Sequence, residues 1–271
     1  MKIFLKKLLS ERIIFILKKW KIKYFPSQYE LLFKENQKNL FETRIKFYSI
    51  FIKKGDLCYD VGANIGNRVD AFLHLGAEVI AVEPQKSCYT ILEMKYGNKI
   101  KIVKKGLGAE VGTLDFHISD STVLSSFSTD WINSVKSERF KNNKWKTILK
   151  TEITTLDNLI LEFGVPAFIK IDVEGYELEV LKGLSKPIGL ISFEYTVPEQ
   201  TDKVIECIMQ LESIENEIEC NYCSGETMIL ELNHWIKASE MKKYISNDKF
   251  VKSGFGDIYI KCKQMPSSLG L

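Results

Sequence analysis

The sequence predicts an α/β fold built on a mostly parallel sheet with helices on both faces. From residue 55 onward, short apolar runs rich in β-branched residues alternate with helical stretches, which is the pattern of such a sheet. The first such unit is LCYDVGANIGNRVDAFLHLGAEVIAVEP, residues 57–84, which reads as a strand, a turn with two glycines, a helix and a second strand. A hydrophobic fraction of 45% in 271 residues is enough for one large domain with a proper core.

The remaining elements follow in order along the chain. Strands and helices alternate up to residue 105, after which two added strands, 112–118 and 150–156, flank a long polar stretch. A stretch of this length inside a compact domain is usually functional, such as a lid, or partly disordered. A helix-start signal at Thr154 then restores the alternation. The other predicted strands are 57–61, 79–83, 99–105, 167–173, 189–195, 217–223 and 256–262, the last two as an antiparallel pair at the sheet edge, and the predicted helices are 67–75, 87–97, 156–164, 176–184 and 200–212.

The N-terminal segment differs from the rest of the chain in charge. Residues 1–54 carry 14 Lys and Arg against 4 Asp and Glu, a balance of +10 in a chain whose net charge is only +3. A basic segment in front of an acidic body suggests an anionic surface as a partner. We therefore divide the chain into a basic helical extension (1–54), the main α/β domain (55–263) and a short C-terminal tail (264–271).

The first 25 residues are basic and apolar at once. Read as a helix, they gather apolar residues together and crowd eight Lys and Arg onto the remaining surface, which suits a helix lying in a membrane interface. The alternative is a helix laid across the main domain with its lysines in water. No run of about 18 apolar residues occurs, so no membrane-spanning segment is predicted. We expect a cytoplasmic protein that can make peripheral contact at the inner face of the membrane.

The cysteines indicate a reducing compartment. Six of them are scattered at positions 58, 88, 207, 220, 223 and 262, whereas a disulfide scaffold would be shorter and denser. Cys220 and Cys223 form a single C-x-x-C pair. Zinc would require four ligands, and neither a second pair nor a nearby histidine cluster supplies them. We interpret this pair as structural, with metal or redox chemistry as the alternative.

The glycine turn indicates which ligand can bind at the end of the first strand. Gly62 and Gly66 are spaced G-x-x-x-G, whereas a dinucleotide loop uses G-x-G-x-x-G to place a pyrophosphate against backbone N–H groups. Asp60 ends the first strand and would repel a phosphate but attract an ammonium or a sulfonium. Glu83 ends the second strand, 21 residues after Gly62, where a carboxylate can accept hydrogen bonds from ribose hydroxyls. S-adenosylmethionine, which has no phosphate, fits this turn; the alternative is a domain in which these are merely turn residues.

The turn DVGANIG, the strand VIAVEP and the later block FIKIDVEGYELEVLKG belong to a set of five sequence blocks. Taken in order, these blocks resemble the FkbM family of class I S-adenosylmethionine-dependent methyltransferases. The resemblance runs from about Phe47 to Lys263 and rests above all on FIKIDVEGYELEVLKG, residues 168–183. It implies a Rossmann-like fold whose seven-stranded sheet has the order 3-2-1-4-5-7-6 with strand 7 antiparallel. It also implies methylation, usually at oxygen and often on sugars or natural products. The other blocks are DVGANIG (60–66), VIAVEP (79–84), GLGAEVGTLDF (106–116) and TTLDNL (154–159).

The resemblance also implies roles for single residues. Carried over by position, Glu83 holds the ribose of the cofactor, and Gly106 and Leu107 border its adenine. The two added strands form an inserted hairpin or lid on this fold. The residues that line the methionine end of the cofactor are Asp60, Gly62, Asn64 and Gly66.

Asp172 is the predicted catalytic residue. In the strand that leads to it, Ile169, Ile171 and Val173 share one face, which leaves Lys170 and Asp172 on the other. Asp172 lies at the carboxyl end of that strand, beside the cofactor strand, where it can take the proton of a hydroxyl acceptor during methyl transfer. The alternatives are a carboxylate that caps the next helix, or a metal ligand. No partner ligands are identifiable, so no metal site is predicted.

Four residues are predicted to contact the acceptor: Ser125, Ser126, Glu174 and Glu194. The two serines belong to the polar stretch, which also contains Trp131 and several Lys and Arg. Hydroxyls, aromatic rings and cations together suit a sugar, particularly one that bears acid groups. The alternatives are a solvated mobile loop for the serines and, for Glu194, an edge position that pairs with lysines.

The predicted function is therefore O-methylation of a hydroxyl on a sugar, glycan or related natural product, with S-adenosylmethionine as the methyl donor. No nucleic-acid partner is expected. One rival is an NAD(P)-dependent oxidoreductase on a similar first half, which would want a third glycine in the turn and a catalytic Tyr/Lys or His. The other rival is a non-catalytic glycan-binding relative that kept the fold.

Overall fold

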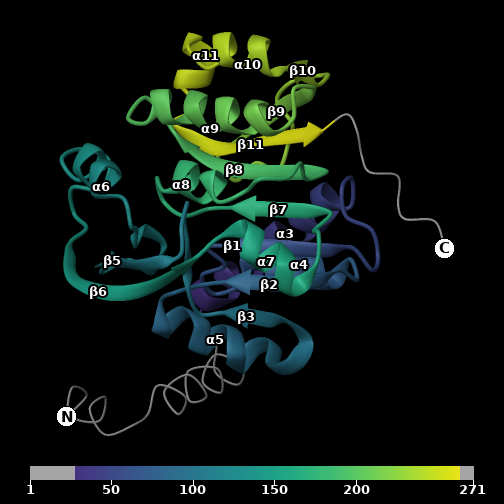
Figure 1. Ribbon diagram of the computed structural model, residues 1–271. Coiled ribbons are helices and arrows are strands. Elements are labelled where there is room, and N and C mark those ends of the chain that lie inside the picture. Colours follow the sequence, from purple (N-terminus) through teal and green to yellow (C-terminus); the bar gives the residue numbers. More distant parts are fainter. Residues whose placement is uncertain (1–27, 263–271) are drawn as a thin grey trace, which may run out of the picture.

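A sheet of eight strands forms the centre of the molecule (Figure 1). The computed structural model describes residues 28–262. Nearly every side chain of the central strands is buried, as expected where helices cover both faces of a parallel sheet. The strands are β1 (Leu57–Val61), β2 (Glu78–Val82), β3 (Lys101–Val103), β7 (Phe168–Ile171), β8 (Leu190–Thr196), β9 (Ile218–Ser224), β10 (Ile236–Lys237) and β11 (Phe255–Cys262).

The strand order is β10-β9-β11-β8-β7-β1-β2-β3. β1 pairs in parallel with β2 and β7, whereas β11 runs antiparallel to both β8 and β9. Read from β3, the first seven strands follow the predicted order 3-2-1-4-5-7-6, with β11 as the antiparallel strand 7. The predicted fold class is confirmed, but the number of strands was wrong. The sheet has an eighth strand because Ile236 and Lys237 pair with β9, outside the predicted antiparallel pair of β9 and β11.

Helices cover both faces of this sheet. Apolar residues of α7, α8 and α9 share one core with Tyr59 and Ile169 of the strands. Those of α3, α4 and α5 share the other core with Cys58 and Phe168, because neighbouring residues on a strand point to opposite faces. Thr155 caps α7 with its hydroxyl, one residue later than predicted. The helices are α3 (Gln28–Tyr48), α4 (Asn67–His74), α5 (Lys86–Tyr96), α6 (Thr129–Val135), α7 (Leu156–Phe163), α8 (Glu177–Lys182), α9 (Thr201–Ile214), α10 (Ala238–Tyr244) and α11 (Asp248–Val251).

A second, smaller sheet carries the inserted segment, on the left of Figure 1. Its strands are arranged β4-β6-β5, and β6 is antiparallel to β5, so the predicted inserted hairpin is confirmed. The polar stretch between these two strands is folded: it contains α6, and Trp131 packs there with Leu124, Ile132 and Val135 in a small core. The alternative of a solvated loop was therefore wrong. The strands are β4 (Gly106–Leu107), β5 (Gly112–Ser119) and β6 (Trp145–Thr154).

The end of the predicted N-terminal extension packs into the main core. Phe47 and Tyr48, at the end of α3, are buried, and their rings lie edge-to-face against Tyr259 and Phe72, respectively. The predicted boundary at residue 55 thus falls after residues that share the core of the sheet. The basic helix predicted for residues 1–25 and the tail lie outside the described residues, so membrane contact stays a prediction. Within residues 28–262, no helix has both the length and the apolar character required to cross a bilayer.

The C-x-x-C pair lies on one strand, β9, with both cysteines buried. Cys220 packs in one core of the sheet and Cys223 in the other, since residues three apart on a strand point to opposite faces. All six thiols of the chain are free. The structural interpretation is confirmed, because two side chains on opposite faces of a sheet cannot share a metal ion or form a disulfide.

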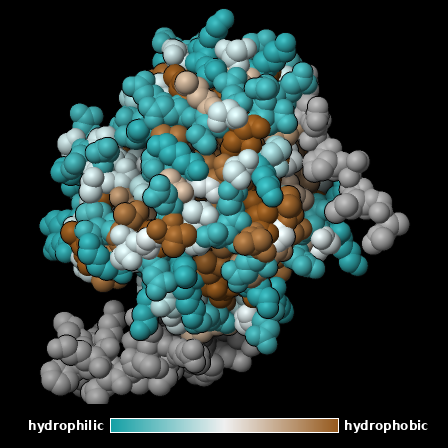
Figure 2. All heavy atoms as spheres, viewed as in Figure 1, coloured by the Kyte–Doolittle hydropathy of each residue, from teal (hydrophilic) through white to brown (hydrophobic). Residues whose placement is uncertain are grey.

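The surface is mostly hydrophilic on the face shown in Figure 2, with hydrophobic side chains gathered near the middle of that face. Leu161 of α7 and Val165, in the turn that follows α7, are among the large apolar side chains exposed to solvent. Exposed apolar side chains of this kind are common on folded domains, so they need no partner to explain them.

Candidate active site

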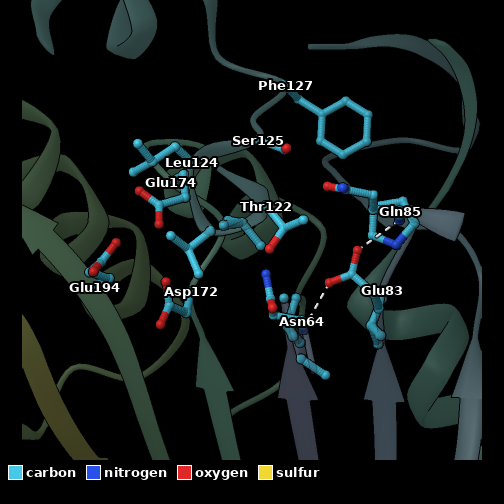
Figure 3. A pocket seen from close by; sticks show the side chains of 18 of the residues that line it. Asn64, Glu83, Gln85, Thr122, Leu124, Ser125, Phe127, Asp172, Glu174 and Glu194 are labelled. Carbon is cyan, nitrogen blue, oxygen red and sulfur yellow. Dashed lines mark hydrogen bonds between the residues drawn. The ribbon is translucent and has the colours of Figure 1, made fainter. Parts of the chain in front are cut away.

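The carboxyl ends of β1, β2, β7 and β8 open into a cavity of about 660 Å³ (Figure 3). Ligands of open parallel sheets bind at this edge, and the volume is in the range that holds a small-molecule ligand. Four strand ends supply one wall through acidic residues, and the inserted segment supplies another. The acidic residues are Asp60, Glu83, Asp172 and Glu194. The residues of the inserted segment are Phe116, Thr122, Val123, Leu124, Ser125, Phe127, Trp131, Arg139 and Phe140.

The turn after β1 uses its backbone N–H groups within the protein. Those of Gly62 and Ala63 both donate to the carbonyl oxygen of Val82, each at 3.0 Å. That of Asn64 donates to Oε2 of Glu83 at 2.8 Å. A bound pyrophosphate needs such groups to be free. These three N–H groups are therefore not available to a dinucleotide, which argues against the rival oxidoreductase.

The two glycines of this turn are required by the protein itself. Gly62 has a φ of +82°, and a Cβ atom there would overlap with the carbonyl oxygen of Asp172. Gly66 has a φ of +87°, and a Cβ atom there would overlap with the ring of Tyr96. Among the described residues, Gly62 lines the cavity and Gly66 does not. The prediction that Gly66 lines the methionine end of the cofactor site is therefore not supported by the cavity, whereas Gly62 does line it. Gly62 lets the end of β7 approach the turn, and Gly66 lets helix α5 approach it.

Glu83 is held by the backbone on either side of it. The residue is 5% exposed, and its Oε1 accepts the N–H of Gln85 at 2.7 Å while Oε2 accepts that of Asn64. Burial raises the pKa of Glu83 to about 7, although both hydrogen bonds favour the ionised form. Each carboxylate oxygen has room for a second donor. The anchored group can therefore still accept hydrogen bonds from ligand hydroxyls in the cavity.

Asp60 lies beneath the turn and is 2% exposed. Its carboxyl group accepts the N–H of Val69 in the first turn of α4, but Oδ2 has no hydrogen-bond partner within residues 28–262. Burial raises the pKa of Asp60 to about 7, against the opposing effect of Arg68 and Lys170. An acidic group thus already occupies the N-terminus of α4, where a phosphate would have to bind. The free oxygen instead suits a donor such as an amino group.

A less polar part of the cavity lies beside Glu83. Gly106 and Leu107 line it, together with the rings of Phe116 and Phe127. Gln85 also lines the cavity, and its Oε1 is buried without a partner in the part of the chain that the structure describes. Sequence reasoning missed Gln85 and Phe127. Gln85 directly follows the block VIAVEP and could have been included with it, whereas nothing in the polar stretch distinguished Phe127.

Three carboxylates meet at the other end of the cavity. Asp172, Glu174 and Glu194 each have an oxygen within 4.8 Å of the others, and Figure 3 shows them on the side away from Glu83. Burial, followed by the charge of Asp172, raises the pKa of both Glu174 and Glu194 well above the usual value. Oxygen clusters can hold a divalent cation, but acidic groups also gather without one. The expectation that no metal binds here stays a prediction.

The carboxylate of Asp172 does not cap the helix that follows. Among the described residues, the N-terminus of α8 has no side-chain cap hydrogen bond, and Oε1 of Glu177 accepts the N–H groups of Val173 and Gly175 in the turn before the helix, at 3.0 and 3.2 Å. Oδ2 of Asp172 instead lies 3.3 Å from Nζ of Lys170, and the side chain of Asp172 keeps 30% of its surface exposed. The capping alternative is thus contradicted, and Asp172 is left in the wall of the cavity.

The two predicted serines differ in position. Ser125 lines the cavity, and its Oγ accepts the N–H of Ser119 at 3.1 Å. Ser126 is fully buried, and its hydroxyl donates to the carbonyl oxygen of Glu174 at 2.7 Å. The structure therefore does not bring Ser126 to the cavity. Its role is to hold the turn at Glu174, a non-glycine residue with a φ of +55°.

The cations that line the cavity are all paired with carboxylates. Each of the three is a Lys or Arg whose nitrogen lies within 3 Å of an acidic side chain of the described residues. The charged groups that remain unpaired by these cations, at the end of the cavity with Asp172, Glu174 and Glu194, are therefore acidic. The pairs are Arg68 with Glu226 at 2.8 Å, Lys105 with Glu152 at 2.9 Å, and Arg139 with Glu199 at 2.7 Å.

The strand order, with its antiparallel strand between the last two parallel ones, and the cavity at the carboxyl ends of the strands define the class: a Rossmann-like class I methyltransferase. The chain belongs to the FkbM methyltransferase family, since the model of the methyltransferase FkbM domain matches residues 60–237, more than half of the sequence. A curated relative is the hexuronic acid methyltransferase AglP of Haloferax volcanii, which is 28% identical over 145 residues. The match covers 52% of this chain and 55% of that protein, so the chain spans about half the length of this relative.

Solved structures with a similar fold are distant in sequence. The precorrin-6Y C5,15-methyltransferase of Geobacter metallireducens has a TM-score of 0.41 at 10% identity, with 81% of this chain and 88% of that chain covered. A TehB-like SAM-dependent methyltransferase of Corynebacterium glutamicum has a TM-score of 0.42 at 10% identity, with 85% and 96% covered. The family assignment rests on the match to the FkbM domain.

Proposed function

We propose that this protein is an S-adenosylmethionine-dependent O-methyltransferase that acts on a hydroxyl group of a sugar, glycan or related natural product. The observation that carries the proposal is that one cavity contains the anchored carboxylate of Glu83 at one end and the carboxylate of Asp172 at the other. The first can recognise a ribose, and the second can accept a proton. Family membership makes the chain a methyltransferase, and we infer the acceptor from the site.

The residues of the cavity fit S-adenosylmethionine. Two buried acceptor oxygens, Oδ2 of Asp60 and Oε1 of Gln85, have no partner within residues 28–262, and the amino groups of this cofactor would satisfy them. We assign the ribose to Glu83 and the adenine to the less polar part beside Gly106 and Leu107. Bound there, S-adenosylmethionine supplies an electrophilic methyl group on a sulfonium.

Asp172 is the general base of this proposal. Its side chain is partly exposed in the wall of the cavity, so a carboxylate oxygen can accept the proton of an acceptor hydroxyl. Help of this kind is typically worth ~10²–10⁴-fold in rate. Burial, followed by the charge of Asp172, raises the pKa of Glu174 and Glu194 well above the usual value, which favours their protonated forms. Both can then donate hydrogen bonds to other oxygens of the acceptor.

A sugar suits the acceptor end for two reasons. The aromatic rings of Trp131 and Phe140 line the cavity together with polar groups such as Ser125, and sugars offer both apolar faces and hydroxyls to such walls. In addition, the relative AglP acts, according to its name, on a hexuronic acid. Because each lining cation of the described chain is paired, we infer a neutral sugar rather than a hexuronate, which departs from the acid-bearing sugar expected from the sequence.

Two experiments test the proposal. Calorimetry compares S-adenosylmethionine with NAD; we expect binding of the first only, and tight binding of NAD alone would contradict the cofactor assignment. Transfer of a radioactive methyl group is then measured with matched pairs of neutral and uronic-acid glycosides. We expect label on the neutral member, at a hydroxyl oxygen. A protein that binds glycans but transfers no methyl group to any of them would support the non-catalytic rival instead.

A further inference from the structure

Lys170 is fully buried in the middle of the sheet. It lies on β7, on the face covered by α3 and α4, because its neighbours Ile169 and Ile171 belong to the opposite core. Nζ of Lys170 lies 2.6 Å from Oδ1 of Asp257 on β11 and 3.3 Å from Oδ2 of Asp172. Strand β8 lies between β7 and β11, so the lysine crosses a whole strand to reach Asp257.

This buried ion pair is a poor explanation for stability. Taking charges out of water is costly, and apolar residues of similar volume in such positions are often as stable or more stable. Burial opposes the charge of Lys170, but Asp172 and Asp257 outweigh it and hold the pKa of Lys170 well above its usual value. The sheet therefore maintains a permanent cation directly beneath the cavity, at a position where an apolar side chain would pack.

The cation contacts one member of the acidic cluster. Nζ of Lys170 lies within ion-pair distance of Asp172 and, among the described residues, forms no ion pair with Glu174 or Glu194. Three carboxylates within 4.8 Å of one another cannot all be ionised at low cost, so they share protons. The carboxylate that contacts the cation is the one whose negative charge is compensated.

We propose that Lys170, with its charge balanced by Asp257, is a positioning residue that selects Asp172 as the ionised member of the cluster and fixes its Oδ2. The other oxygen of Asp172 then remains for the acceptor, while Glu174 and Glu194 keep their protons and act as donors. This inference rests on the proposed function, in which Asp172 is the base. The lysine thereby determines which of the three carboxyl groups of the cluster acts as the base.

The charges around Asp172 determine in which direction its protonation should change when Lys170 is removed. Apart from Lys170, the nearby cation is Arg68, which is already paired with Glu226. The other neighbours are acidic. Without the lysine, the negative charge of Asp172 would no longer be compensated by a neighbouring cation, and a proton would be held more favourably on Asp172 than in the wild type. The charged groups that interact with Asp172 are Asp60 from β1, Lys170 from β7, Glu174 from the turn, Glu177 from α8 and Glu194 from β8; Arg68 from α4 and Asp257 from β11 interact with Lys170.

Carbon-13 NMR of the carboxyl groups tests this without any methyl acceptor. The purified, full-length protein is labelled at the carboxyl carbons of Asp and Glu, and the signals are assigned with Asp172→Asn, Glu174→Gln and Glu194→Gln. At pH 7 we expect an ionised Asp172 and protonated Glu174 and Glu194. In K170M/D257N, which removes both partners of the pair, the signal of Asp172 should shift toward the acid form. A wild-type protein in which Asp172 is protonated and a glutamate ionised would overturn the proposal, even if the double variant did not fold.

A matched surface pair provides the control. K182M/E179Q removes an exposed ion pair of α8 that does not line the cavity, and it should leave the three carboxyl signals unchanged. Once an acceptor is in hand, the transfer rate of K170M/D257N at pH 7 should fall about tenfold or more and recover as the pH is raised. An unchanged Asp172 signal in the folded double variant would overturn the proposal. Absence of any methyl transfer by the wild type would instead count against the proposed function, while the proton assignment would stand.

Discussion

The backbone of Gly62 lies directly against the carbonyl group of Asp172, so that a single added methyl group at position 62 would overlap with the carbonyl oxygen. The N–H of Asp172 donates to the carbonyl oxygen of Val61 at 2.9 Å, which joins the same two segments. The glycine turn and the proposed base are thus one structural unit. A change in the turn should move the base as well as the cofactor loop.

Gly62→Ala should therefore destabilise the protein and impair methyl transfer together. The φ of +82° disfavours any residue with a Cβ atom, and the overlap with Asp172 adds a steric cost. We expect a loss of about 2–5 kcal/mol in the free energy of unfolding, measured with urea. Gly55→Ala is the matched control, because Gly55 has a similar φ of +88° but open space around it. It should lose only about 1–2 kcal/mol. Equal losses in the two variants would show that the contact with Asp172 is unimportant.

Glu83 should control cofactor affinity in a pH-dependent way. Its carboxylate must be ionised to accept both ribose hydroxyls, and burial raises its pKa to about 7 in the free protein. Affinity for S-adenosylmethionine should therefore increase between pH 6 and pH 8, measured by calorimetry. Glu83→Ala should weaken binding about ten- to a hundredfold, the usual cost of a charged hydrogen-bond pair. Glu83→Gln should bind weakly too, because its amide NH₂ would face a backbone N–H, and its affinity should depend less on pH. An Ala variant that binds as tightly as the wild type would contradict the assignment.

The sheet was predictable from the sequence because its signals are local and strong. Buried runs such as residues 57–61 and 168–171, separated by helical stretches, specify parallel strands without further information. The eighth strand was not predictable, because a strand of two residues, Ile236 and Lys237, has no period that can be read. The folded state of the polar stretch was also missed. It depends on Trp131 packing against its neighbours and against Gly175, a contact between segments far apart in sequence.

The site was predictable where residues follow strand ends directly. Asp60, Glu83 and Asp172 each come at or just after the end of a central strand, so all three line the cavity. Contacts that cross the sheet could not be predicted. The sequence placed Lys170 on the same face as Asp172 but gave no sign of its partner Asp257, which lies 87 residues further along the chain. Ser126 was misplaced because composition does not show whether a hydroxyl points outward or bonds to a turn.

Stability of the cofactor-free protein should decrease as the pH rises toward 7. Burial raises the pKa of Asp60, Glu83 and Glu177 to about 7 each, above the usual values of 3.8 to 4.5. At a pH between the usual pKa values and the raised value of about 7, the folded protein holds protons that the unfolded chain has released. The free energy of unfolding should then fall by about 1.4 kcal/mol per pH unit for each such proton. Urea unfolding at pH 5.5, 6.5 and 7.5 measures this slope.

Glu177→Gln isolates one of these protons. Both hydrogen bonds from Val173 and Gly175 go to the same oxygen of Glu177, so a Gln carbonyl oxygen can accept them equally. The variant should keep its stability at pH 5.5 and lose less of it by pH 7.5 than the wild type does. A slope identical to that of the wild type would show that Glu177 is not a source of the pH dependence.

Asp172→Asn should separate chemistry from binding. The amide keeps the size of the side chain and an oxygen that can contact Lys170, but it cannot take a proton from a hydroxyl. We expect S-adenosylmethionine to bind within a few-fold of wild type and the transfer rate to fall by ~10²–10⁴-fold, as is typical when a general base is lost. Asp115→Asn is the control, because Asp115 is an exposed residue of β5 that pairs with Lys150 away from the cavity. Calorimetry and single-turnover transfer, measured on the same preparations, give the two quantities. Normal turnover in Asp172→Asn would mean that alignment of the acceptor suffices and that no base is needed. Loss of cofactor binding in that variant, with Asp115→Asn unaffected, would mean that Asp172 belongs to the cofactor end of the cavity.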